Sequence, residues 1–118
     1  RLGWWCAAGR PIEEYRRTMT YVGVLHFVVD TTACHSLKEK RAVVRSIVAK
    51  AERHFPISIS EVDHQNDVTR AGVSAVVVHS DRATCERILQ KVDGQARSHG
   101  VRVYDSAVDV FRWTPDDD

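Results

Sequence analysis

The stretch YVGVLHFVVDTTACHSLKE, residues 21–39, predicts the first strand and the start of the first helix, and with them the fold. Residues 21–29 are mostly β-branched, aromatic or apolar at both odd and even positions, as in a central strand covered on both faces. Ser36, followed three residues later by Glu39, matches a capping box, whose side chains bind free N–H groups of the first helical turn. We therefore predict a strand at 21–29 and a helix that begins at Leu37.

The same kinds of signal continue toward the C-terminus. Pro56 ends the first helix, Asp81 is a suitable N-cap for a second helix, and Gly100 suits the C-terminal cap of that helix. The predicted elements are, in order, the first helix at 37–54, strands at 57–60 and 72–79 on either side of a polar turn at 63–67, the second helix, and a last strand at 101–111.

This order of strand, helix, strand, strand, helix, strand is that of the ferredoxin-like βαββαβ fold of the α+β class. It predicts one four-stranded antiparallel sheet with both helices on one face. Val22 and Val24 have the opposite parity to Leu25 and Phe27, so the uncovered face keeps apolar side chains in either assignment. Such a face usually meets a partner, and both a homodimer through the sheet and cover by the N-terminal segment stay open.

Length and composition indicate a single soluble domain. The 118 residues allow one core, and 17 basic against 16 acidic side chains give no overall positive field that would by itself indicate nucleic acid. Cys6, Cys34 and Cys85 are odd in number and form no CxxC pair, which argues against a disulfide framework and a zinc site. No run approaches the roughly 18 apolar residues of a membrane span. We expect a cytoplasmic protein that does not bind membranes.

The chain divides into three parts. Residues 1–18 lack the apolar core of a signal peptide, and we interpret them as an N-terminal extension upstream of a biological start at Met19. The domain then occupies residues 19–113. Residues 114–118 end in three aspartates and are expected to be a solvated acidic tail.

The first helix has the strongest local charge, with six basic and two acidic side chains and thus an excess of four positive charges. At helical spacing, Lys38, Arg41 and Arg45 share one exposed side, where they could meet successive phosphates or an acidic protein surface. A solvated face that only keeps the domain soluble is the plainer interpretation, and composition alone favours it.

The densest polar cluster lies around the turn between the second and third strands. A histidine flanked by carboxylates, as His64 is by Asp63 and Asp67, could be a general base or a metal ligand. The spacing matches no metal motif, so a solvated turn is favoured. Glu61 has the parity of the core side, and an ion pair with Arg70 across the hairpin would explain it.

The sequence lacks the residues that several known activities of this fold require. The third strand, GVSAVVVH at 72–79, has no aromatic side chain on which an RNA base could stack. The loop at 30–36 has one sulfur and neither glycine nor arginine, which argues against a copper site and a phosphate-cradling loop. We therefore predict no enzymatic activity, no catalytic residue, no metal, no cofactor and no small-molecule substrate.

Residues 36–41 (SLKEKR), together with 61–65 (EVDHQ) and the step Arg70-Ala71, resemble the YlxP-like family, a bacterial domain of unknown function with a ferredoxin-like fold. The family often has Trp-Gln before Arg-Ala, where this chain has Val68-Thr69. Carried over residue by residue, the resemblance implies a nucleic-acid-binding surface at Lys38, Lys40, Arg41 and Arg45, and a second polar patch at Glu61, His64 and Arg70.

Genes of this family often lie beside those of translation initiation and ribosome-maturation factors, which implies a role near the ribosome by association only. We therefore predict a non-catalytic accessory protein that docks on structured RNA or the small ribosomal subunit through backbone phosphates. The alternative is a homodimeric protein-interaction module that uses the open sheet face, with the basic helix merely solvated.

Overall fold

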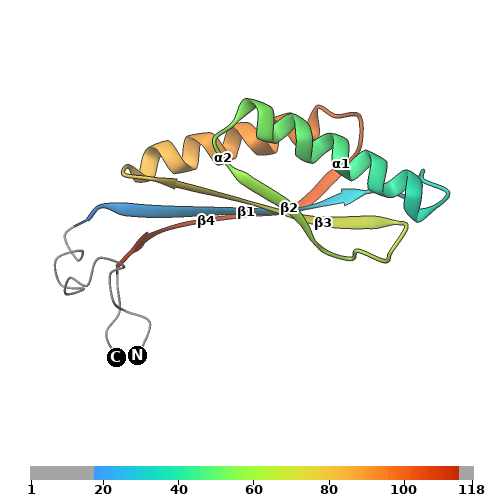
Figure 1. Ribbon diagram of the computed structural model, residues 1–118, viewed down its shortest axis with the longest axis horizontal. Coiled ribbons are helices and arrows are strands. Elements are labelled where there is room, and N and C mark those ends of the chain that lie inside the picture. The colour runs from blue at the N-terminus through green and yellow to red at the C-terminus, as the bar shows by residue number, and fades with distance from the viewer. Residues whose placement is uncertain (1–17, 115–118) are drawn as a thin grey trace, which may run out of the picture.

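The computed structural model describes residues 18–114, which form two helices and four strands. The elements are β1 (Thr20–Asp30), α1 (Leu37–His54), β2 (Ser58–Asp63), β3 (Arg70–His79), α2 (Arg82–Arg97) and β4 (Val103–Trp113). The strands make one antiparallel sheet in the order β2-β3-β1-β4, and both helices cover the same face (Figure 1). The predicted ferredoxin-like α+β fold is confirmed. The predictions for residues 1–17 and 115–118 lie outside the described residues.

The core lies between this helical layer and the sheet. Leu25, Phe27 and Val29 of β1 are fully buried, because every second residue of the strand points toward the helices. Gly23 has the same parity, and a Cβ atom there would lie 2.8 Å from Cδ1 of Leu89 in α2. The absence of a side chain at Gly23 therefore lets α2 pack closely on the sheet.

Local signals set the starts of both helices. The Ser36 hydroxyl accepts a hydrogen bond from the N–H of Glu39 at 3.1 Å, and Asp81 accepts one from Thr84 at 3.0 Å. The Glu39 carboxylate accepts from the N–H of His35, one residue before the position that a capping box predicts.

The boundaries of the strands and the end of α2 differ from the prediction. β2 runs to Asp63, three residues beyond its predicted end, so the loop between β2 and β3 begins at His64. The C-cap of α2 is Ser98, and Gly100, with φ +87°, lies in the turn that follows. β4 accordingly begins at Val103.

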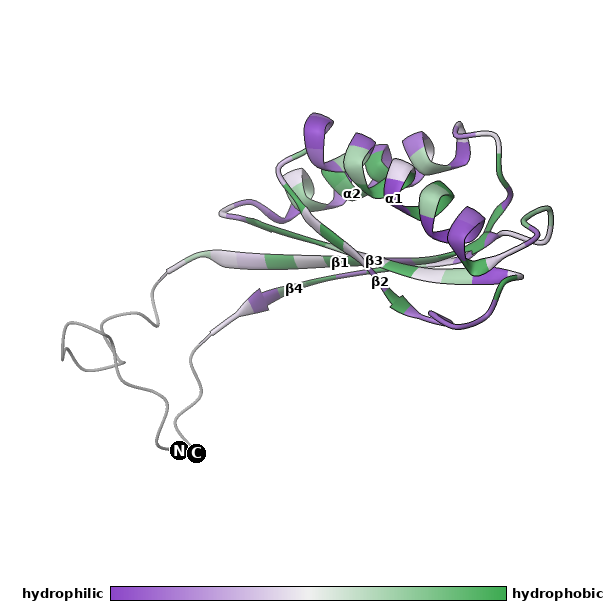
Figure 2. Ribbon diagram, turned by 45° about the vertical axis from the view of Figure 1, so that its right-hand side comes forward, coloured by the Kyte–Doolittle hydropathy of each residue, from purple (hydrophilic) through white to green (hydrophobic). Residues whose placement is uncertain are grey.

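Within residues 18–114, the other face of the sheet has no helix over it (Figure 2). At one end of this face, Val22 of β1 lies opposite Val78 of β3 and Phe111 of β4, and Val24 lies opposite Val76. Val78 and Phe111 are 61% and 41% exposed. We call Val22, Val24, Val76, Val78 and Phe111 the open-face patch.

The first and last strands are neighbours. Thr20, the first residue of β1, is paired with Trp113, the last residue of β4, so the two ends of the described fold lie at the same edge of the molecule. Within residues 18–114, no helix is both long and apolar enough to cross a membrane.

Candidate functional site

The basic face of α1 is on the surface, as helical spacing predicts. Lys38, Arg41 and Arg45 are all exposed, and none of them forms an ion pair or a hydrogen bond within the described part of the chain. Their positive charges are therefore available to an outside ligand.

Lys40 is a correction to the predicted nucleic-acid-binding surface. Its side chain is completely buried, with Nζ 3.0 Å from Oε2 of Glu61, and it donates a hydrogen bond to the backbone carbonyl of His64. A buried ammonium group cannot contact a phosphate outside the protein. Lys40 instead joins α1 to β2 and to the loop that follows β2.

The sequence contained a signal for the burial of Lys40. Lys40 comes three residues after Leu37 and four before Val44, so it occupies a place in the apolar stripe of α1. Glu61 has the parity of the buried Ile59 on β2. A basic residue in one apolar stripe and an acidic residue in another indicate a buried pair.

The second polar patch is also arranged differently from the prediction. Glu61 pairs with Lys40 and not with Arg70, whose Nε lies 3.1 Å from Oδ2 of Asp67. The structure thus brings Glu61 and His64 together around Lys40, while Arg70 belongs to a separate contact within the loop.

His64 is half-buried and has the backbone conformation of a turn. Its φ is 59°, and its carbonyl accepts from the N–H of Asp67 at 3.0 Å in addition to Lys40. Nε2 of His64 lies 3.4 Å from Oδ2 of Asp63. Between residues 18 and 114, no three His, Cys, Asp or Glu side chains gather in a way that could hold a metal ion.

Asp67 is occupied by its own loop. Hydrogen bonds from the hydroxyl and the N–H of Thr69, helped by Arg70, lower the pKa of Asp67 from 3.8 to about 2. These bonds explain the density of polar residues in this loop without a ligand.

A groove of about 450 Å³ lies between α1 and β2, and we call it the α1–β2 groove. Arg41 and Arg45 line it from α1, and Gln65 and Asn66 line it from the loop after β2. Nε2 of Gln65 donates to the carbonyl of Glu61 at 3.1 Å, at the outer edge of β2. The sequence places these loop amides in a turn, but it gives no sign that they face the arginines, because only tertiary packing sets α1 beside β2.

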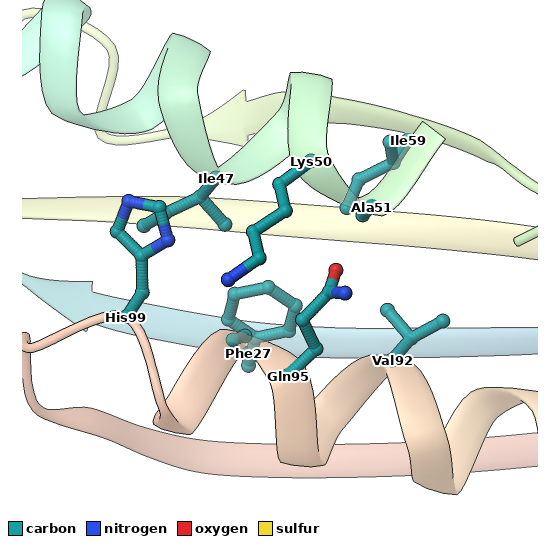
Figure 3. Close-up of a pocket in the computed structure, with 9 residues that line it drawn as sticks. Phe27, Ile47, Lys50, Ala51, Ile59, Val92, Gln95 and His99 are labelled. Carbon is teal, nitrogen blue, oxygen red and sulfur yellow. The ribbon is translucent and has the colours of Figure 1, made fainter. Parts of the chain in front are cut away.

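A second hollow, between α1 and α2, is too narrow to bind a molecule. Phe27 lies at its floor, and Lys50, Gln95 and His99 lie at its rim (Figure 3). It has no room for a water-sized molecule. The Ser46 hydroxyl and Nε2 of His99, 3.2 Å apart, connect α1 to the turn that follows α2.

The two cysteines of the described residues, Cys34 and Cys85, are free thiols. Cys85 lies on the buried face of α2, where its thiol contacts the carbonyl of Tyr21 at 3.8 Å, and burial raises its pKa. Cys34 lies half-buried in the loop after β1. Cys85 therefore packs as a small core residue.

Comparison with known proteins gives a family and no activity. The family model described as "Protein of unknown function (DUF503)" matches residues 22–108. The uncharacterized protein YlxP of Bacillus subtilis (strain 168) is 40% identical over 57 residues, 48% of this chain and 62% of that protein, which is less than two thirds of its length. The de novo designed protein Foldit4 is similar with a TM-score of 0.44 and 14% identity, over 82% of this chain and 99% of that one. A C-terminal segment of the alpha subunit of aIF2 from Pyrococcus abyssi has a TM-score of 0.45 and 10% identity, over 86% of this chain and 55% of that one.

Proposed function

Because this chain belongs to the DUF503 family of proteins of unknown function, as its YlxP-like motifs predicted, its activity must be inferred from its own surface, and we propose a non-catalytic, cytoplasmic accessory protein that binds structured RNA or the small ribosomal subunit. The chain contacts the phosphate backbone through α1 and reads no bases. A protein that contacts only the phosphate backbone needs basic side chains. A protein that recognises bases needs side chains that stack on them or reach their edges.

The observation that supports this proposal is the set of three exposed cations on α1, Lys38, Arg41 and Arg45, none of which is neutralised within residues 18–114. Surface arginines and lysines often lie beside carboxylates, as Arg97 lies 2.8 Å from Asp93 in α2. Unpaired cations on one side of a helix can each replace a counterion of a nucleic acid.

The test is sedimentation of the tagged protein from cell lysate through a sucrose gradient at low and moderate salt. We compare the wild type with a triple variant, Lys38→Ala, Arg41→Ala and Arg45→Ala. The matched control removes the same charge from three other exposed cations: Arg53→Ala, Arg87→Ala and Lys91→Ala. We expect comigration with small-subunit particles, lost at moderate salt and in the α1 triple variant but kept in the control.

If the wild type stays at the top of the gradient at every salt concentration, the RNA proposal is wrong for this protein. If both triple variants lose comigration equally, binding depends on total charge and not on the basic face of α1.

A second candidate function is homodimerisation, and the open-face patch is the observation that favours it. Five apolar side chains lie next to one another on three strands, and neither of the two helices of the described residues covers them. Contiguous apolar surface of this kind usually marks an interaction site. A dimer formed through it would resist salt, because the attraction is hydrophobic, and sedimentation at two salt concentrations therefore separates it from RNA binding.

A further inference from the structure

We propose that the α1–β2 groove is a phosphate-binding seat, in which Arg41 and Arg45 hold the backbone of an RNA strand. The proposal rests on the proposed function and locates it: Lys38 lies outside the lining of this groove, whereas both arginines lie inside it. Two of the three exposed cations of α1, Arg41 and Arg45, therefore lie in a concave site that a phosphate could enter.

The groove is positively charged because its acidic residue is already neutralised. Glu61 is the one carboxylate among the described residues that line it. Its Oε2 is 3.0 Å from the buried ammonium group of Lys40, so the pair contributes little net charge. The two guanidinium groups have no such partner in residues 18–114, which leaves the groove with two uncompensated positive charges.

The side chain of Asn66, opposite the arginines, can also donate hydrogen bonds to a phosphate. Asn66 is exposed, lines the groove and has an amide group without a partner in the described chain. Ser60 also lines the groove, but it alternates along β2 with Ile59 and Glu61, so its hydroxyl lies on the other face of the sheet and donates to the neighbouring carbonyl of Glu61 at 3.3 Å. The one carboxylate on this side among the described lining residues, Glu61, is paired with Lys40.

The spacing of the arginines suits a chain of phosphates. Residues four apart on a helix are separated by about 6 Å along its axis, so both forks can contact one phosphate or two adjacent ones. Val44 and Val48 of α1 and Ile59 of β2 form the apolar floor of the groove. A sugar can pack on such a floor. The volume of about 450 Å³ accommodates a nucleotide-sized group.

The test is an NMR titration of the ¹⁵N-labelled full chain with a small RNA stem-loop at low salt. We expect the largest shifts at the Asn66 side-chain amide and the Ser60 backbone amide. The double variant Arg41→Ala/Arg45→Ala should bind the RNA at least about tenfold more weakly, because two charge-assisted contacts are lost. The matched control Arg53→Ala/Lys91→Ala, which removes two exposed cations outside both the groove lining and the basic face of α1, should lose less than about threefold.

A second variant leaves the arginines in place. Asn66→Asp puts a negative charge opposite them, and we expect it to weaken RNA binding about as much as the arginine pair does. Since Asn66 is exposed, the substitution should not affect folding, which the spectrum of the free variant reports directly.

The outcomes separate this inference from the proposed function. If RNA binds but the shifts lie elsewhere and Asn66→Asp has no effect, the groove is not the seat, while the RNA-binding function stands. If the stem-loop does not bind at low salt, both fail. If a poly-glutamate peptide shifts the groove amides and RNA does not, the occupant is an acidic protein segment, and the phosphate proposal is wrong.

Discussion

Lys40 and Glu61 form the most unusual contact of the chain at the scale of single residues. A fully buried lysine loses its hydration, and only the carboxylate of Glu61 and the carbonyl of His64 replace it. Breaking a buried pair usually costs more than the pair itself contributes, because the remaining charge is left without a partner. The pair also holds the loop beside the α1–β2 groove in place.

We expect Lys40→Met to destabilise the domain by about 3 kcal/mol, since it leaves the carboxylate of Glu61 unpaired at the edge of the core. The double variant Lys40→Met/Glu61→Leu should recover most of this loss. Urea unfolding measures both effects. Lys38→Met, on the exposed side of the same helix turn, is the control and should change stability by less than about 0.5 kcal/mol. An equal, small effect of Lys40→Met and Lys38→Met would show that the pair does not contribute to stability.

Asp67 makes the stability of the loop depend on pH. Its pKa is lowered from 3.8 to about 2 in the folded protein, so the charged form is favoured by folding. This contribution is fully present above about pH 4 and is lost as the pH falls through about 2. Asp67→Asn should therefore be less stable than the wild type at pH 7, and the difference should disappear near pH 2.

The measurement for Asp67 is urea unfolding at pH 7, 3 and 2, with an NMR titration of the carboxyl group. Thr69→Val removes the hydroxyl donor that lowers the pKa most, so it should raise the pKa of Asp67. A difference between wild type and Asp67→Asn that stays constant down to pH 2 would contradict the assignment.

The sequence predicted the exposed residues of the site better than its buried ones. Lys38, Arg41 and Arg45 follow from helical spacing alone. The prediction for Lys40 is wrong because the resemblance that implied it carries over residue types and not their burial. The contact of Glu61 with α1, in place of Arg70 on the next strand, depends on how the helix lies over the sheet, which local patterns do not contain.

At the scale of elements, the boundaries with a strong chemical signal were predicted and the others were not. α1 runs from Leu37 to His54 as predicted, because Ser36 and Pro56 mark its ends. β2 extends to Asp63 through polar residues, since an edge strand with one wet face looks like a turn in sequence. Of its six residues, only Ile59 is buried.

The close packing of α2 on β1 gives a test at this scale. Gly23→Val places atoms where Cδ1 of Leu89 already lies within 2.8 Å of an ideal Cβ, and Cγ1 of Val77 lies within 3.1 Å. We expect a loss of stability of about 2 kcal/mol, because overfilling a packed core forces the helix away from the sheet. Thermal unfolding followed by circular dichroism measures it.

Gly94, on the exposed side of α2, is the matched control. A Cβ atom at Gly94 would meet nothing within 4 Å, so Gly94→Ala should stabilise the helix by about 0.5–1 kcal/mol. If Gly23→Val is tolerated as well as Gly94→Ala, α2 does not pack as closely on β1 as the structure indicates.

At the scale of the whole molecule, the helices of residues 18–114 cover one face of the sheet only. The sequence predicted that the uncovered face would keep apolar side chains, because Val22 and Val24 have the opposite parity to the core residues of β1. It did not predict that these would gather with Val76, Val78 and Phe111 at one end, since that depends on strand register. A homodimer stays a prediction.

The open-face patch predicts self-association that depends on protein concentration and not on salt. Val78→Lys/Phe111→Lys should abolish it without unfolding the domain, since both side chains are exposed. Sedimentation velocity at 0.05 M and about 0.5 M salt measures the state of each protein. Val62→Lys is the control, because Val62 is 52% exposed on β2, away from the patch. A wild type that stays monomeric at high concentration rules out the dimer.

The pairing of Thr20 with Trp113 has a mechanical consequence. Because β1 and β4 are antiparallel neighbours whose outer ends lie together, a force that separates the two ends of the domain acts on one inter-strand hydrogen bond at a time. The strands would part like a zipper, starting at this pair, and would not have to shear as a unit. We therefore expect the domain to unfold at a low stretching force when its two ends are pulled apart.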